Sequence, residues 1–119
     1  MNVPLREIAQ RLIGFDTTSD RNNAPAMDYA AELLERAGFS IHLNRYHRDG
    51  VEKTNLLAQV GPPEPPGLMI SGHMDTVPFD NQSGWTRDPL NLEVDDEWVY
   101  GRGTSDMKVF LAQTLDAVQ

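Results

Sequence analysis

Two short polar stretches carry the residues whose types and spacing could do chemistry. His73-Met74-Asp75 follows directly on the apolar run at residues 68–72, and residues 101–106 form a glycine-bearing turn that ends on Asp106. An imidazole can ligate a metal through one nitrogen while the hydrogen on the other donates to an acceptor that fixes the tautomer. Asp75 is close enough to be that acceptor. Both stretches therefore favour metal chemistry, and Asp106 would add a carboxylate ligand.

Each stretch alone also has a structural interpretation. A histidine two residues before an aspartate is often only a hydrogen-bonded histidine. Asp106 stands where a helical pattern begins, and aspartate is an ordinary residue of a helix start whose carboxylate accepts from backbone amides. The other two histidines, His42 and His47, lie on or beside an early strand, where we expect solvent-exposed side chains.

Two further groups attract attention and receive no functional role. Asp95-Asp96-Glu97 is an acidic run that is typical of a solvated surface turn. Trp85 and Trp98 stand singly, and large aromatic residues in such positions are more often packing anchors than parts of a substrate site.

Length and composition limit what these residues can belong to. The chain has 119 residues, which is the size of at most one domain, and it has no cysteine. Disulfide scaffolds and thiol chemistry are excluded, so any metal must be held by His, Asp or Glu. A net charge of -8 disfavours nucleic acid and anionic membranes as partners. The sequence has no basic leader and no apolar run long enough to span a membrane, so we expect a soluble cytoplasmic protein.

The elements that must position these residues follow from periodicity and stop signals. Apolar residues at three- and four-residue steps predict helices from Leu5 to near Gly14, from the Ala24-Pro25 start to near Gly38, and onward from Asp106. Strands are predicted at residues 39–44, 55–60 and 98–100, with a stiff proline-rich loop at residues 61–67. The run at residues 68–72 has the pattern of a buried central strand, and the fold class is α/β.

Taken together, the two stretches resemble a known family. Ser71-Gly72-His73-Met74-Asp75-Thr76-Val77-Pro78 and Gly101-Arg102-Gly103-Thr104-Ser105-Asp106-Met107-Lys108 resemble the two N-terminal signatures of the dinuclear zinc aminoacylase and carboxypeptidase family. The intervening segments 75–80 and 84–90 are most similar to its acetylornithine deacetylase branch. The resemblance covers nearly the whole chain. Its one departure is Val109, where the family usually carries glycine.

The resemblance implies a role for each matched residue. His73 would bind one zinc ion, Asp106 would bridge two, and Asp75 would be a catalytic residue that orients the His73 ring. Cobalt is the alternative metal. A bridging carboxylate lets two cations share one water and lower its pKa towards neutrality. The implied reaction converts N-acetylornithine, a small N-acyl amino acid, into ornithine and acetate in arginine biosynthesis.

The resemblance also implies that parts of such an enzyme lie outside these residues. The family's general base belongs to a Glu-Glu pair downstream of the Asp106 helix, with further ligands later, and no two glutamates of this chain are adjacent. We therefore expect residues 1–119 to be the N-terminal part of a three-layer α/β/α zinc-peptidase-like catalytic domain. That domain would be truncated after its first metal-ligand helix and would lack its lid and dimerisation domain. The complete enzyme would be a homodimer, and this chain an inactive monomer with an exposed sheet edge.

Other interpretations stay open at this point. The same signatures fit a succinyl-diaminopimelate desuccinylase, an aminoacylase or a di- or tripeptidase, because the residues that choose the substrate lie largely beyond Gln119. A different class is a non-catalytic domain that binds metal weakly. Zinc normally takes three or four protein ligands, and His73 and Asp106 supply only two.

Overall fold

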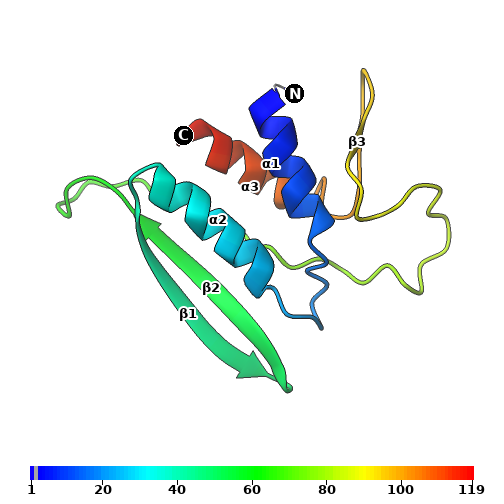
Figure 1. Cartoon of the computed structure of the whole chain (residues 1–119), viewed down its shortest axis with the longest axis horizontal. Coiled ribbons are helices and arrows are strands. Elements are labelled where there is room, and N and C mark those ends of the chain that lie inside the picture. Colours follow the sequence, from blue (N-terminus) through cyan, green and yellow to red (C-terminus); the bar gives the residue numbers. More distant parts are fainter. Residues whose placement is uncertain (2) are drawn as a thin grey trace.

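The chain folds into three helices and two small antiparallel sheets in the computed structural model, which describes residue 1 and residues 3–119, Val3 by its backbone only (Figure 1). The elements in order are α1 (Val3–Gly14), α2 (Ala24–Arg36), β1 (Ser40–Arg48), β2 (Val51–Gln59), β3 (Glu93–Val94), β4 (Val99–Tyr100) and α3 (Lys108–Ala117). The mixed α/β class is confirmed.

The helices begin and end where local chemistry predicts. α1 ends at Gly14, as expected. α2 has Pro25 in its first turn, where the missing N–H costs nothing, and the Asn22 side chain accepts a 2.7 Å hydrogen bond from the Ala24 amide. α2 ends at Arg36, two residues before Gly38, whose φ of 88° is readily adopted only by glycine.

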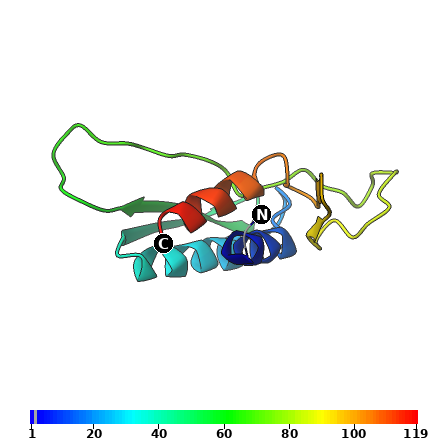
Figure 2. The ribbon, with the colours of Figure 1, turned by 90° about the horizontal axis from the view of Figure 1, so that it is seen from above.

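The core lies between the helices. α1 and α3 pack against each other, and Figure 2 shows α1 and α2 side by side in one layer with α3 above them. Val109 is half-buried, and α3 forms and packs despite this departure from the family pattern. The core cluster of buried residues consists of Ile8, Ala9, Leu12, Ile13, Ala26, Ala30, Leu33, Met74, Leu92, Ala112 and Leu115.

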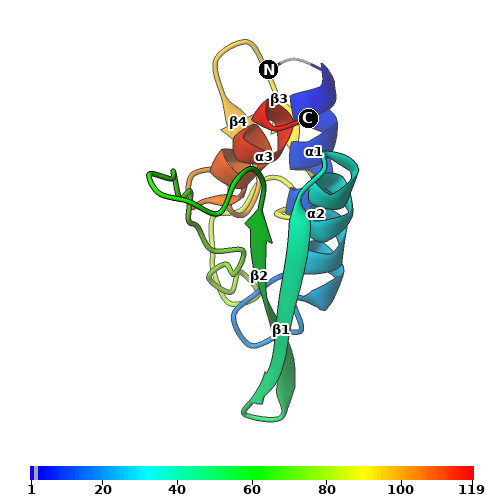
Figure 3. The same cartoon turned by 90° about the vertical axis from the view of Figure 1, so that its left-hand side faces the viewer.

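The larger sheet is a single long hairpin. β1 pairs antiparallel with β2 from Ser40↔Gln59 to Arg48↔Val51. Asp49 and Gly50 both have positive φ in the connecting turn, which is the arrangement that Asp-Gly hairpin turns favour. One end of this hairpin extends beyond α2 (Figure 3). His42 and His47 are exposed on β1, as predicted.

The predicted buried strand at residues 68–72 is wrong. The segment is not assigned to a strand, and Leu68 and Met69 are 89% and 82% exposed. A strand needs a hydrogen-bonded neighbour, and the part of the chain that the structure describes places none beside it. Only its end is closely packed, because a Cβ on Gly72 would lie 2.8 Å from the Leu111 side chain on α3.

The expected three-layer arrangement is not formed within the described residues. The second sheet, β3 with β4, is separate from the hairpin and pairs Glu93 with Tyr100 and Val94 with Val99. There is thus no single central sheet with helices on both faces among the residues described. None of the helices in this described part has the length and apolarity needed to cross a membrane.

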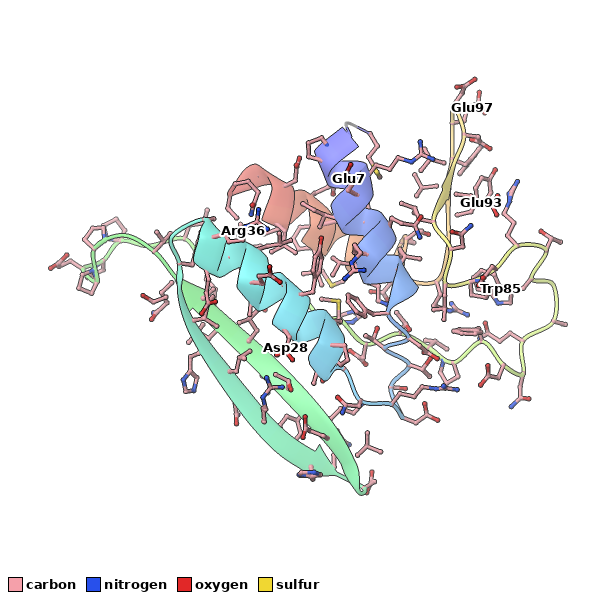
Figure 4. The ribbon with its side chains drawn as sticks, viewed as in Figure 1. Glu7, Asp28, Arg36, Trp85, Glu93 and Glu97 are labelled. Atoms are coloured by element: carbon pink, nitrogen blue, oxygen red, sulfur yellow. The ribbon has the colours of Figure 1, made fainter. Side chains whose placement is uncertain are left out.

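The turn between β3 and β4 is organised by Asp95. Its Oδ1 accepts hydrogen bonds from the Glu97 and Trp98 amides, and its Oδ2 accepts one of 2.9 Å from the Tyr100 hydroxyl. The acidic run is thus the predicted surface turn, with Glu97 at its outer end (Figure 4). Trp98 is not a packing anchor, because it is 64% exposed in this turn.

Candidate functional site

His73 and Asp75 lie on one side of an extended segment because side chains alternate along extended backbone. Met74 and Thr76 point the other way and are each 6% exposed, with Met74 in the core cluster. His73 and Asp75 are exposed. Burial of the intervening residues therefore turns the imidazole and the carboxylate to the surface together.

The loop after α1 holds this segment in place. The Thr17 hydroxyl donates to the Met74 carbonyl at 2.6 Å. The Thr76 amide donates to the Thr17 carbonyl, and the Ser19 amide donates to the Thr76 carbonyl, both at 3.0 Å. Thr18 and Thr76 form an isolated parallel bridge. Residues 73–76 are thus hydrogen-bonded to the loop segment 17–19 and not to a regular strand.

Asp106 is placed by the turn between β4 and α3. The Lys108 amide donates to the Gly103 carbonyl at 2.7 Å, and the Asp106–Met107 peptide bond is cis. Gly103 has a φ of 89°, and a Cβ there would lie 3.1 Å from both the Lys108 side chain and Thr76. Only glycine allows the turn to pass this closely over its neighbours.

Lys108 joins the turn to the end of α1. Its side chain has no exposed area, and its Nζ donates a 2.7 Å hydrogen bond to the Phe15 carbonyl. Burial lowers the pKa of Lys108 to about 8, against the opposing influence of the Asp16 carboxylate. The turn that carries Asp106 is thereby connected to the end of α1 through one buried side chain.

The structure brings His73, Asp75 and Asp106 together. His73 Nε2 lies 2.9 Å from Asp106 Oδ1, across 33 positions of sequence. His73 Nδ1 lies 3.0 Å from the Asp75 carbonyl and 3.2 Å from its carboxylate. Burial alone would lower the pKa of His73, but the hydrogen bonds to Asp75 and Asp106, with both negative charges, raise it above its ordinary value.

Asp106 is not the helix cap that the structural interpretation suggested. α3 begins at Lys108 after Met107, without a capping side-chain hydrogen bond. The Asp106 side chain is 80% exposed and bonds to His73 instead. It is therefore free of the local amides that would have restricted it to a structural role.

These residues line a cavity of about 390 Å³. Its wall comes from three stretches of the chain: Ser19, then His73 with residues 75–78, and finally residues 101–106. A second hollow of about 270 Å³ adjoins it through Gly101 and Thr104 and includes Trp85. The candidate site is thus a pocket wall, with the His73 and Asp106 side chains accessible from solvent.

The donor set suits zinc but does not complete a site. Imidazole nitrogen and carboxylate oxygen are both zinc ligands, and one ion bound at about 2.0–2.1 Å to each would hold two donors about 3 Å apart. His73 Nε2 and Asp106 Oδ1 are 2.9 Å apart, so only a slight movement of these two side chains away from each other would make room for the ion. Among the described residues no group of three or more metal-binding side chains converges.

Sequence reasoning missed the residues that support the site. Thr17 and Ser19 belong to a loop without a recognisable motif, and their partners lie 57 positions away in both cases. Lys108 belongs to the second signature, but the resemblance implies no role for it. Its residue type could have indicated this role. A lysine among the apolar positions at the start of a helix is expected to be buried, and a buried lysine needs a hydrogen-bond acceptor.

Comparison with known proteins decides the family. The sequence model of peptidase family M20/M25/M40 matches residues 69–119. These residues include His73, Asp75 and Asp106. Residues 69–119 belong to this peptidase family. The family segment therefore covers the whole candidate metal site, whereas the supporting loop at residues 15–19 lies before it.

The similarity to individual relatives covers most of the chain. An acetylornithine deacetylase of Myxococcus xanthus is 43% identical over 116 residues, which is 95% of this chain and 30% of that protein. An acetylornithine deacetylase of Photorhabdus laumondii is 40% identical over 87% of the chain and 26% of its own length. A succinyl-diaminopimelate desuccinylase of Ehrlichia canis is 34% identical over 94% of the chain and 29% of its own length. The chain thus spans less than a third of the length of each of these relatives.

Proposed function

We propose that the complete protein is a zinc-dependent amidohydrolase that converts N-acetylornithine into ornithine and acetate in arginine biosynthesis. These 119 residues would supply the N-terminal part of its three-layer catalytic domain. The remaining ligands, the general base, and the lid and dimerisation domain would come from sequence beyond Gln119. In this proposal the complete enzyme is a cytoplasmic homodimer, and the chain by itself is inactive.

The observation that carries the proposal is the contact between His73 and Asp106. Two zinc-type donors from segments 33 positions apart meet at the wall of one cavity, with Asp75 on the far nitrogen of the imidazole. This arrangement occurs within the part matched by the M20/M25/M40 family, in a chain whose relatives include acetylornithine deacetylases.

The residues of this chain would hold and orient the metal. His73 would bind one ion through Nε2, and Asp106 would bridge two. The exposed Asp106 carboxylate lies 2.9 Å from His73 Nε2, which supports a shared ion between these two side chains. Asp75 would keep the imidazole hydrogen on Nδ1 and fix the ring direction. When bound, zinc ions polarise the amide carbonyl and acidify water.

A second substrate is favoured by one specific observation. The Ehrlichia canis relative is named a succinyl-diaminopimelate desuccinylase and matches 94% of the chain at 34% identity. Desuccinylation of N-succinyl-diaminopimelate is therefore the alternative activity. Both substrates are N-acyl amino acids, and both reactions hydrolyse a linear amide, so the same His73 and Asp106 roles would serve either.

The test begins by sequencing the gene past the codon for Gln119 and then compares both substrates with the complete protein and zinc. We expect faster hydrolysis of N-acetylornithine, loss of activity on chelation, and loss in His73→Ala and Asp106→Ala. His42→Ala is the matched control, because His42 is an exposed histidine on β1. Unchanged activity in His73→Ala would overturn the proposal. A stop codon directly after Gln119 would instead favour a non-catalytic domain that binds metal weakly.

A further inference from the structure

Arg102 is a cation on the wall of the candidate site. It lines the same cavity as His73 and Asp106, and it is the only Arg or Lys among the described residues that form that wall. In the part of the chain that the structure describes, ion pairs form at Arg21, Arg45 and Arg87, but no carboxylate pairs with Arg102. An arginine beside a cavity without an anionic partner is suited to bind an anion from solution.

The contacts of Arg102 leave one donor unpaired. Its Nη2 donates to Gln82 Oε1, and its guanidinium lies over the Trp85 ring, 4.9 Å from the ring centre. Its Nε is buried and has no hydrogen-bond partner among the described residues. A buried donor without an acceptor costs free energy, which the other contacts of the guanidinium must offset.

Nε and Nη2 are neighbouring donors on one edge of the guanidinium. A carboxylate offers two oxygens in the same plane and can accept from both of them at once. The Gln82 amide offers a single oxygen, which already accepts from Nη2 and, at 3.5 Å, from Trp85 Nε1. Gln82 therefore satisfies half of an edge that a carboxylate would satisfy completely.

We propose that Arg102 binds the carboxylate of the substrate, which replaces the side-chain oxygen of Gln82 and also pairs with Nε. The inference rests on the proposed function and assigns the residue that recognises the free carboxylate of its N-acyl amino acid substrate. Arg102 is then a substrate-binding and specificity-determining residue beside the candidate metal ligands.

The charges of the site support this role. The chain carries a net charge of -8, and Asp75 and Asp106 line the same cavity. Asp75 and Asp106 repel the carboxylate group of a substrate that enters this cavity, so a positive charge must attract that group. Apart from the proposed zinc ions, Arg102 is the only Arg or Lys of the described wall that can do so.

The exchange requires little of the fold. Gln82 and Trp85 lie in an irregular exposed segment, and Figure 4 places Trp85 on the outer loop, away from the three helices. Displacement of the Gln82 side chain breaks no helix or strand hydrogen bond. The backbone of Arg102 stays in place meanwhile, because its amide donates to the Pro89 carbonyl at 2.7 Å.

The Nε–H resonance of Arg102 gives a direct test by NMR on the isotope-labelled complete protein without added metal. The probe is N-acetylglycine, and its neutral analogue N-acetylglycinamide has the same amide without the carboxylate. Arg102→Lys assigns the resonance by removing it. Arg87 is a matched internal control, because it also stacks on an aromatic ring, Tyr100 at 3.8 Å, but already pairs with Glu93 at 3.3 Å.

We expect N-acetylglycine to shift the Arg102 resonance with saturation, N-acetylglycinamide to leave it unchanged, and Arg87 to respond to neither. Gln82→Ala removes the competing acceptor and should tighten N-acetylglycine binding several-fold. No shift with N-acetylglycine, or an equal shift with the neutral analogue, would show that Arg102 only anchors the 82–85 segment. Arg102→Lys serves only to assign the resonance, and both probes are compared on the unchanged protein, so the stability of a variant does not decide the result.

The outcome is separable from that of the proposed function. If the complete protein bound a carboxylate at Arg102 but hydrolysed no N-acyl amino acid, the proposed amidohydrolase function would be wrong and Arg102 would still be an anion-binding residue. Hydrolysis of N-acetylornithine without a response at Arg102 would overturn this inference alone.

Discussion

The Thr17 hydroxyl donates a 2.6 Å hydrogen bond to the Met74 carbonyl, 57 positions away. That carbonyl lies between His73 and Asp75, the two residues that turn outward from the same extended segment. Thr17 is 2% exposed and Met74 is 6% exposed, so water does not replace the contact. The direction of the His73 and Asp75 side chains therefore depends on a residue that touches neither of them.

Replacement of Thr17 by valine tests this contact. Thr17→Val keeps the shape of the side chain but removes the hydroxyl that donates to the buried Met74 carbonyl. We expect this loss to lower the free energy of unfolding by about 1–3 kcal/mol. Thr17→Ser keeps the hydroxyl and is the control. Urea unfolding of the three proteins gives the comparison, and a valine variant more stable than the serine variant would contradict the prediction.

Gly103 should tolerate no side chain. Gly103→Ala places a Cβ 3.1 Å from Lys108 and Thr76 at a φ of 89°. The positive φ alone costs a non-glycine residue about 1–3 kcal/mol, and the crowding adds to this. Gly84→Ala is the matched control, since Gly84 has a φ of 94° with nothing within 4 Å. Thermal unfolding should show a larger loss at position 103, and equal losses would disprove the crowding.

Asp16 should make the fold sensitive to acid. Burial alone would raise its pKa, but the Thr18 hydroxyl and amide and the nearby Arg21 charge lower it below 3.8. A carboxyl whose pKa is lower in the folded state stabilises the fold above its unfolded pKa, and this stabilisation is lost as pH falls through the folded value. Between pH 7 and about pH 3, the unfolding free energy should therefore fall more in the unchanged chain than in Asp16→Asn. Parallel pH profiles would contradict this.

Zinc should bind weakly to the chain and through the site described. Calorimetric titration is expected to show an affinity that falls at least about tenfold in His73→Ala or Asp106→Ala, since changes even outside the ligand shell cost about 10–100-fold. His47→Ala, an exposed histidine on β1, should leave zinc binding unchanged. An equal loss in His47→Ala would assign the binding to the hairpin instead.

The extended segment at residues 68–72 should accept charge. Met69 is 82% exposed, so Met69→Lys should change the unfolding free energy by no more than about 0.5 kcal/mol. It should also reduce self-association, because an extended segment with exposed apolar side chains and no strand partner can pair with another copy. Sedimentation at several concentrations measures the association. Strong destabilisation by lysine would show that this segment is buried in solution.

Local patterns predicted the elements that local chemistry controls. Glycine stops and apolar periodicity placed the ends of α1 and α2 within a few residues, and alternation at Ile41 and Leu43 indicated β1. The expected convergence of His73 and Asp106 matches their 2.9 Å contact, although the resemblance, rather than periodicity, indicated it. Their roles as zinc ligands remain predictions.

Features that depend on distant partners could not be predicted in this way. An apolar run such as Leu68-Met69-Ile70 becomes a buried strand only if neighbours pair with it, and local sequence carries no information about them. Asp106 could cap a helix or face a histidine with the same sequence around it. Thr17 and Lys108 act through backbone carbonyls, which every residue has, so no motif distinguishes their partners.

The buried hydrogen bond from Lys108 to Phe15 also sets the order of events when the protein is made. The two residues are 93 positions apart, and at translation rates of about 5–20 residues per second Phe15 is made roughly 5–20 s before Lys108. Throughout that interval the Phe15 carbonyl lacks its Lys108 donor, and the loop at residues 15–19 that supports His73 is without this contact. The site therefore cannot assemble until Lys108 has been synthesised, after α1, α2 and the β1–β2 hairpin.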